Sequence, residues 1–344
     1  MAEFRCRPAP REGVAERAVE REVQHARQQR RAVRRGHVAL YLLRLLVLVG
    51  LVDAEAFAED MELRAPGAAR QRGDAGSSPV ACVQEVGEVV RRHVEGRVHA
   101  EGVHAGLAYP VAVALAQWIN ALPQRRYTYR ILFVPETIGA IVYLSRHLAV
   151  MKKNTVAGFV LTCMGDDRAY SYVASRLGDT LADRVAKHVL SYHAPQYQAY
   201  SFLDRGSDER QYCSPGVDLP VCSVIRSKYG TYPEYHTSSD DLSLISPQGL
   251  QGGFDAVRKC LEILENNYVY ETAVPCEPQL GKRGLYPTLS AKDTKDKVRH
   301  MMDFLAYADG TKDLIGIAET IGVNAKLLIP IATQLLEHKI LRQL

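Results

Sequence analysis

From about residue 110 onward, apolar residues recur with the spacings expected of helices and buried strands. Residues 111–122 carry apolar side chains at helical spacing and end before a proline. Residues 127–134 are rich in β-branched and aromatic side chains and stop at Pro135, which predicts a buried strand followed by a turn. Residues 155–162 repeat the strand pattern. The pattern therefore predicts a folded α/β region.

The alternation of helix and strand patterns continues over the following hundred residues. Helical patterns cover residues 137–145, 177–192 and 246–268, and strand patterns cover residues 198–202 and 221–226. Alternating strands and helices are typical of α/β proteins, in which ligands usually bind beyond the carboxyl ends of the strands. We therefore expect functional side chains just after the predicted strands.

The C-terminal part has a different pattern, beyond a Pro- and Gly-bearing linker at residues 273–287. Three short helices are predicted, with a turn at Gly322-Val323 between the last two, and a strand begins at Ile340. The predicted helices cover residues 295–307, 311–321 and 324–338. This order resembles a winged helix-turn-helix, to which we assign residues 285–344.

The first 108 residues differ in composition from the rest. Residues 1–118 contain no Lys, Ile, Thr or Asn, whereas the remaining residues contain all four. Codons for these four residue types begin with A, so we interpret residues 1–108 as mistranslated after a frameshift or disordered. The alternative is a genuine disordered extension from a GC-rich genome.

Charge and cysteine content narrow the classes of function. The net charge of +4 is small, so nucleic-acid binding is not expected from it. An apolar run at residues 38–52 is short for a membrane span and contains Arg44, so we expect no membrane segment. The seven cysteines show no regular spacing, which favours reduced thiols and a cytoplasmic protein.

Two residues suggest a metallohydrolase. Glu136 follows a predicted strand directly, as expected of a general base at a sheet edge. His236 lies in a turn before the carboxylate pair Asp240 and Asp241, which suits a metal ligand with side chains that orient it. The loops of one sheet can bring these distant positions together.

Three motifs occur in order along the chain. They are Phe133-Val-Pro-Glu-Thr-Ile-Gly139, Arg205-Gly-Ser-Asp-Glu-Arg210 and Tyr235-His-Thr-Ser-Ser-Asp-Asp241. These motifs resemble the zinc aminopeptidase superfamily. In particular, the chain is similar from about residue 113 to residue 344 to polysaccharide biosynthesis proteins with an aminopeptidase-like domain, which also end in a winged helix.

The resemblance implies a fold and a set of roles. It implies a three-layer aminopeptidase-like sheet (phosphorylase/hydrolase-like) with helices on both faces, truncated at its N-terminal side, over residues 109–275. Glu136 would be the general base and His236 a zinc ligand. Carboxylates that line the substrate site or orient the ligand would be Asp208, Asp240, Asp241 and Asp166.

The chain also departs from the superfamily pattern. Thr137 stands where a second, metal-binding Glu is typical, and Cys163 stands where a ligand Asp is expected. The first His ligand and the metal-bridging Asp belong upstream, in the biased segment, and His93, His99 and His104 there lack the motif context. A complete zinc site is therefore not predicted.

Each candidate also has a purely structural interpretation. His236 could be a hydrogen-bonded structural histidine, and Glu136 could cap a helix. Asp166 could belong to an ordinary turn. Asp208 and its neighbour Glu209 could form a surface ion-pair cluster with Arg210.

The preferred hypothesis is a zinc-dependent hydrolase of an amide or peptide bond, linked to polysaccharide biosynthesis and impaired by loss of upstream ligands. Its substrate would be a small peptide or an aminoacylated molecule. The alternative is a non-catalytic scaffold that contacts a protein partner or a second copy through the winged helix. A transcription regulator is the weakest option, because Glu319, Glu337 and Asp313 offset the basic residues there.

Overall fold

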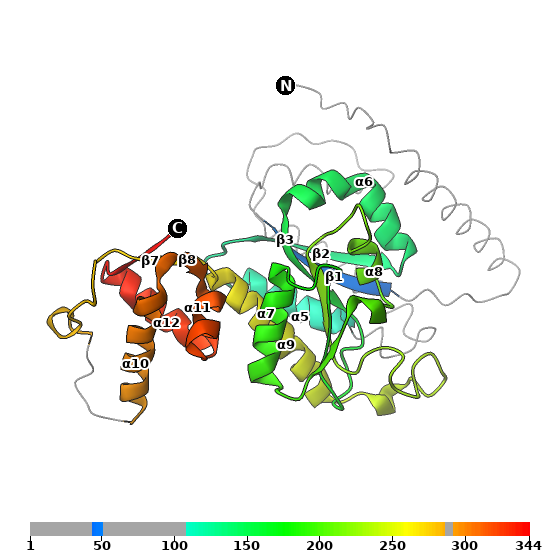
Figure 1. The fold of residues 1–344 in the computed structure, drawn as a ribbon. Coiled ribbons are helices and arrows are strands. Elements are labelled where there is room, and N and C mark those ends of the chain that lie inside the picture. The colour runs from blue at the N-terminus through cyan, green and yellow to red at the C-terminus, as the bar shows by residue number, and fades with distance from the viewer. Residues whose placement is uncertain (1–42, 51–107, 286–291) are drawn as a thin grey trace, which may run out of the picture. The chain divides into compact units, whose positions relative to one another are not determined.

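The computed structural model describes residues 43–50, 108–285 and 292–344. Two compact units divide the chain (Figure 1). The first contains Met1–Asp183 and Gln198–Phe254, and the second contains Arg184–Tyr197 and Asp255–Leu344.

The first unit is built on a six-stranded mixed sheet with the strand order β2-β1-β3-β6-β4-β5. Figure 1 labels β1, β2 and β3 of this sheet. Their bounds are β1 Leu43–Gly50, β2 Thr128–Pro135, β3 Thr155–Leu161, β4 Ser171–Val173, β5 Gln198–Tyr200 and β6 Val221–Ile225.

Strand directions determine which loops meet. β1 is antiparallel to both β2 and β3, so these two strands run the same way, and β3 is parallel to β6. The carboxyl ends of β2, β3 and β6 therefore lie at one edge of the sheet. The loops after these strands contain Glu136, Asp166 and His236, as the sequence pattern predicted.

β1 lies within the segment that the sequence analysis set apart as residues 1–108. Its backbone pairs with all of β2, from Leu43 opposite Pro135 to Gly50 opposite Thr128. It overlaps the apolar run at residues 38–52, and that run thus contributes a central strand. The other residues of the biased segment up to 107 lie outside the described part, so its interpretation as mistranslated or disordered stays a prediction.

Helices cover both faces of this sheet. α6 (Ile138–Asn154) and α8 (Glu209–Tyr212) pack against β2, β3 and β6 through one buried cluster. Successive strand side chains point to opposite faces, so Phe133 lies on the face opposite to Leu132. There it stacks on Tyr109 of α5 (Ala108–Asn120), with ring centroids 5.2 Å apart. The cluster comprises Leu132, Ala140, Leu144, Met151, Val160, Tyr212, Cys213, Leu219 and Val221. The three-layer α/β architecture is confirmed.

The second unit contains a winged helix. Its three-stranded antiparallel sheet has the order β8-β7-β9, and the Tyr270 ring packs edge-on against Phe304, with centroids 5.5 Å apart. The unit also includes α7 (Leu181–His193) from Arg184 and α9 (Pro247–Asn266) from Asp255. Its remaining elements are β7 Val269–Thr272, α10 Lys292–Tyr307, β8 Asp309–Asp313, α11 Leu314–Ile321, α12 Ala325–Glu337 and β9 Leu341–Gln343.

The start of α11 differs from the sequence prediction of a helix over residues 311–321. Residues 309–313 form β8, because Gly310 has a φ of 83° and the Asp309 carboxylate accepts the Thr311 N–H. The helix begins only after Asp313, whose side chain accepts the Gly316 N–H as an N-terminal cap. β7 also pairs with β8 and β9 although it precedes residue 285, the predicted start of the winged helix.

Within the described ranges, no single helix is long and apolar enough to cross a membrane. α11 and α12 pass the test of length and composition only as a pair, which is bent by 117°.

The first turn of α9 packs tightly against the loop after β3, and this packing can be tested. A Cβ added at Gly249 would lie 2.0 Å from the carbonyl oxygen of Gly165 and 2.5 Å from that of Asp166. We expect Gly249→Ala to lower the free energy of unfolding by about 1–3 kcal/mol, because backbone must move. Denaturant unfolding measures this loss.

The exposed Gln248 on the same turn provides the matched control. Gln248→Ala should leave the midpoint unchanged, and an equal stability of Gly249→Ala and wild type would refute the packing argument.

Candidate active site

The turn after β2 is held by α8 and the residues before it. Thr137, directly after Glu136, has a φ of 61° and a ψ of −66°, and a positive φ is uncommon for a β-branched residue. Its N–H donates to Asp208 Oδ1 at 2.7 Å, and Arg210 donates to its hydroxyl. Asp208 is buried. The Asp208 carboxylate therefore stabilises the strained turn that carries Glu136.

The next residue, Glu209, is a fully buried carboxylate with four hydrogen-bond donors. Its Oε1 accepts the N–H of Gly206 at 2.8 Å, the N–H of Ser207 at 3.0 Å and the hydroxyl of Tyr229 at 2.5 Å. Its Oε2 accepts the Ser223 hydroxyl at 3.2 Å. Hydrogen bonds to a charged group contribute about 1.5–3 kcal/mol each. These bonds join the loop before α8 to β6 and to the loop that follows it.

Tyr229 is the aromatic partner in this cluster. Burial and, after it, the neighbouring Glu209 carboxylate raise the pKa of the Tyr229 hydroxyl far above its ordinary value. The hydroxyl therefore remains protonated and serves as a donor to Glu209. Tyr229 also accepts the Gly206 N–H at 2.9 Å, so its position fixes both loops.

The loops after β3 and β6 are joined by a second buried carboxylate. Asp166 accepts the N–H of Ser227 at 2.9 Å, the hydroxyl of Ser227 at 2.7 Å and the N–H of Arg168 at 3.0 Å. The Arg226 Nε donates to the Asp166 carbonyl oxygen at 2.7 Å. This matches the structural interpretation of Asp166 as a turn residue, since its carboxylate is occupied by protein donors.

Two further contacts join the loop after β3 to the segment that carries His236. Arg168 forms a two-pronged ion pair with Glu234, with N–O distances of 2.9 and 2.8 Å. The hydrogen bonds from Arg168 lower the pKa of the Glu234 carboxyl. Cys163 Sγ lies 3.5 Å from the Tyr232 hydroxyl. The solvent-exposed ion pair orients the loop more than it stabilises the fold.

His236 itself is exposed, with a φ of 58°. Its ring stacks on Tyr235, with centroids 4.0 Å apart and planes inclined by 20°. Asp240 is buried, whereas the exposed Asp241 accepts the N–H and hydroxyl of Ser243 and caps a short 3₁₀ helix. These hydrogen bonds from Ser243 lower the pKa of the Asp241 carboxyl.

Together, these contacts place the loops of Glu136, Asp208 and His236 around one sheet edge. A metal centre fits the side chains there poorly. Within the described ranges, no three His, Cys, Asp or Glu residues form a group that could hold a metal ion. Asp166 and Asp241 use their oxygens to accept N–H and O–H donors. The roles assigned to Glu136 and His236 remain predictions.

Sequence reasoning missed the residues that build this framework. Asp208 and Glu209 were open to interpretation as a surface ion-pair cluster, but both are buried. Tyr229 and Ser227 were not singled out. The available signal was position, since both follow a predicted strand directly, whereas nothing in the sequence pairs them with Glu209 and Asp166.

Comparison with known proteins covers most of the described chain. Residues 100–267 match the model of a family described as a domain of unknown function, DUF4910. Residues 268–343 match the model of a winged helix-turn-helix family. The second match begins just before β7, in agreement with the pairing of β7 in the winged-helix sheet.

A curated protein from Clostridium acetobutylicum is 39% identical to the chain over 201 residues. It is named a polysaccharide biosynthesis protein with an aminopeptidase-like domain. The resemblance to this group of aminopeptidase-like proteins is thereby confirmed. The match covers 58% of this chain and 46% of the relative, so the chain spans about half the length of that protein.

One solved structure supports the same fold. A crystal structure of a protein from Clostridium acetobutylicum described as a peptidase aligns with a TM-score of 0.61 and 32% identity, over 70% of this chain and 53% of the other. BSAP, a zinc aminopeptidase from Bacillus subtilis, aligns with a TM-score of 0.37 and 15% identity, over 47% and 41%. The second alignment is too weak to support an argument.

The buried cluster around Glu209 predicts a measurable effect on stability. Tyr229→Phe removes the hydroxyl that donates to Glu209 and leaves the ring in place. We expect a loss of about 1.5–3 kcal/mol in the free energy of unfolding, because a buried carboxylate loses one of its donors. Urea denaturation followed by circular dichroism measures the loss.

Tyr192→Phe is the control, since Tyr192 is exposed. Its unfolding midpoint should equal that of the wild type. An unchanged midpoint for Tyr229→Phe would show that the contact with Glu209 contributes nothing to the fold.

Proposed function

We propose that this chain is an aminopeptidase-like hydrolase of amide or peptide bonds in which metal-dependent activity is impaired. The observation that carries the proposal is the Asp208–Thr137 hydrogen bond, which fixes the turn of Glu136 at the carboxyl edge of the sheet. A carboxylate in such a position can accept a proton from water that attacks a carbonyl carbon. The 39% identical relative named for its aminopeptidase-like domain supports the reaction class.

The impairment follows from the side chains at the same edge. Thr137 stands in the position of a metal-binding glutamate, and Asp166 is occupied by Ser227 and Arg168. His236 would be the zinc ligand of the described part. Within the described ranges, His236 does not lie in a group of three or more possible metal ligands, so we assign no step of the reaction to zinc.

The substrate proposal rests on the relatives. A small peptide or an aminoacylated molecule would fit an aminopeptidase-like site, and the relative's name connects the group to polysaccharide biosynthesis. We place the reaction in the cytoplasm, because the scattered cysteines suit a reducing compartment; the described cysteines are free.

A non-catalytic scaffold is the second candidate. The observation in its favour is that Asp166 and Asp241 are held by backbone and hydroxyl donors, so these loops are ordered by protein contacts. Such an edge could bind a ligand without hydrolysing it.

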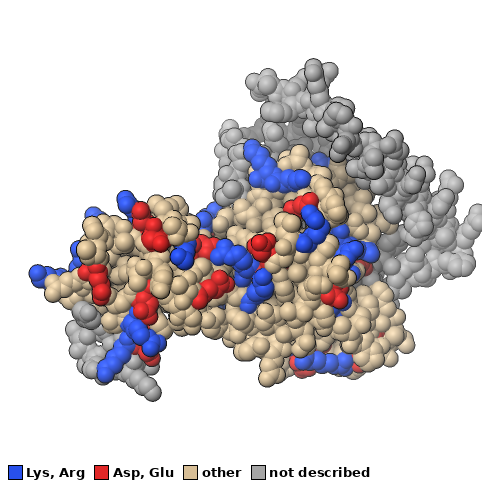
Figure 2. All heavy atoms as spheres, in the orientation of Figure 1, with Lys and Arg blue, Asp and Glu red and all other residues tan. Residues whose placement is uncertain are grey.

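The winged helix suits a protein contact better than nucleic acid. α12 carries the basic Lys326 and the acidic Glu337, and Lys326 is paired with Glu262 at 3.0 Å. On the face drawn in Figure 2, basic and acidic side chains are interspersed. Nucleic-acid binding requires an excess of basic side chains on one face. We therefore propose a protein partner or a second copy of this chain.

Zinc content and amide hydrolysis test the proposed function together. We expect the dialysed full-length chain to retain well under one zinc per molecule and to hydrolyse aminoacyl p-nitroanilides slowly when zinc is added. Glu136→Gln should lower this rate by roughly 100-fold, because a general base contributes at least that much. His236→Ala should lower it as well.

Asp204→Asn is the matched control, because Asp204 is exposed and bonds only within its own short helix. It should retain the wild-type rate. Stoichiometric zinc that survives dialysis and is lost in His236→Ala would disprove the impairment. Absence of any hydrolysis sensitive to Glu136→Gln would favour the scaffold.

A further inference from the structure

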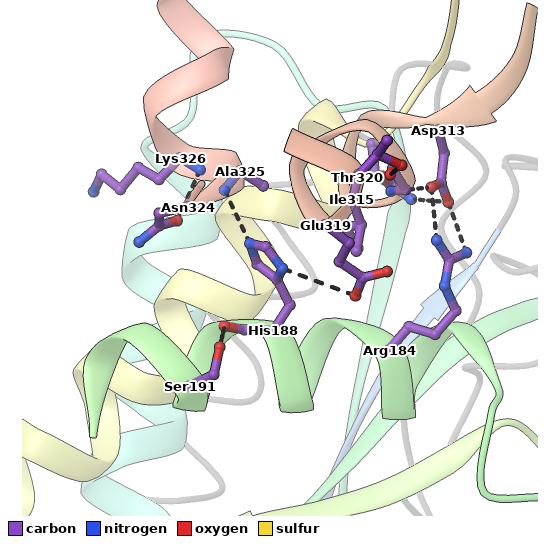
Figure 3. A network of polar contacts seen from close by, with 12 residues as sticks. Arg184, His188, Ser191, Asp313, Ile315, Glu319, Thr320, Asn324, Ala325 and Lys326 are labelled. Carbon is purple, nitrogen blue, oxygen red and sulfur yellow. Dashed lines mark hydrogen bonds and ion pairs between the residues drawn. The ribbon is translucent and has the colours of Figure 1, made fainter. Parts of the chain in front are cut away.

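His188 connects α7 to the winged helix within the second unit. The residue lies in the middle of α7 and is buried, with 4% of its surface exposed. Its Nε2 lies 2.9 Å from the N–H of Ala325, the first residue of α12 (Figure 3). A backbone N–H can only donate, so Nε2 must be the acceptor. The ring is therefore neutral and carries its proton on Nδ1.

This bond satisfies a group that helices leave without an internal partner. The first N–H groups of a helix have no acceptor inside the helix. At the start of α12, the Asn324 side chain accepts the N–H of Lys326, and His188 accepts that of Ala325. In DNA-binding helix-turn-helix proteins the corresponding end of the second helix contacts base edges. Here that end is held by α7.

Charged side chains lie near the ring on α7 and α11, and the titratable Tyr192 of α7 has its ring centroid 5.2 Å from that of His188. Arg184 lies one turn earlier on α7 and pairs with Asp313 at 2.7 Å. Glu319 of α11 lies 4.0 Å from Nδ1 and is half exposed to solvent. Lys326 of α12 is paired with Glu262 of α9. Figure 3 shows His188 between Arg184, Glu319 and Ala325. Glu319 favours the imidazolium, whereas Arg184 opposes it.

Burial has the largest influence on the pKa of the His188 ring. It lowers the pKa of His188, and Arg184 lowers it further. A second proton would also occupy Nε2 and point at the Ala325 N–H, so the hydrogen bond would be replaced by a repulsive contact between two donors. The geometry of the bond and the charge distribution therefore act in the same direction.

We propose that His188 is a pH-sensitive latch, which holds the first turn of α12 on α7 when neutral and releases it when protonated. The sensing group is His188, and the element released is residues 324–328. The proposal is independent of the hydrolysis discussed above.

The sign of the pH dependence follows from linkage. The pKa of His188 is lower in the latched state than in the released state, where it approaches an ordinary value of about 6.5. The latch is therefore fully stabilising above that ordinary value. Its contribution is lost as the pH falls through the lowered pKa of the latched state.

Hydrogen exchange of the full-length chain tests the latch. We would measure the protection factor of a peptide covering residues 322–330 from pH 7.5 to pH 5, corrected for intrinsic exchange. Because release is coupled to one proton, we expect the factor to fall by up to about tenfold per pH unit below the ordinary histidine pKa. A peptide from α10 should show no such fall.

Two glutamine variants separate the latch from general acid effects. His188→Gln keeps an acceptor near the position of Nε2 but cannot titrate, so the protection of residues 322–330 should become independent of pH. His338→Gln changes an exposed histidine at the end of α12 and should retain the wild-type profile. A pH-independent wild type, or the same pH dependence in His188→Gln, would overturn the proposal.

Discussion

The buried carboxylate of Glu209 is the interaction on which the sheet edge depends. Burying a carboxylate away from water costs free energy unless hydrogen-bond donors surround it. Glu209 accepts hydrogen bonds from Gly206, Ser207, Ser223 and Tyr229. These donors come from the loop before α8, from β6 and from the loop after β6, so one side chain fixes three segments. Asp208, the adjacent residue, then holds Thr137 and with it the turn of Glu136. The position of the candidate base thus depends on a carboxylate that is fully buried in the protein.

The same principle explains how contacts within the protein keep this edge ordered. Asp166 is bound by Ser227 and Arg168, which joins the loops after β3 and β6 through protein donors. Protein donors alone therefore join these two loops of the aminopeptidase-like fold. In the second unit, His188 provides a comparable buried polar contact, which fixes α12 on α7.

Sequence patterns identified most helices and the strands β2, β3, β5, β6 and β9, because periodic apolar residues mark these elements and prolines mark several of their ends. They missed β1, since the composition around it is biased, and its central place in the sheet depends on pairing with β2 and β3. They also missed β4 and β7, which are short, and extended the helix of α11 over β8. Glu136 and His236 were identified as candidates by position and resemblance. The burial of Glu209 could not be predicted from the sequence, because it depends on partners that are distant in sequence.

The central claim is that hydrogen bonds within the protein, and not a bound metal, hold the loops at this edge. Thermal unfolding of the full-length chain with and without a strong chelator tests it most directly. The account predicts the same midpoint in both conditions, because Asp166, Asp208 and Glu209 accept hydrogen bonds from protein donors. A midpoint that falls by several degrees with chelator and returns with added zinc would correspond to about 1 kcal/mol or more of metal-dependent stability and would contradict it.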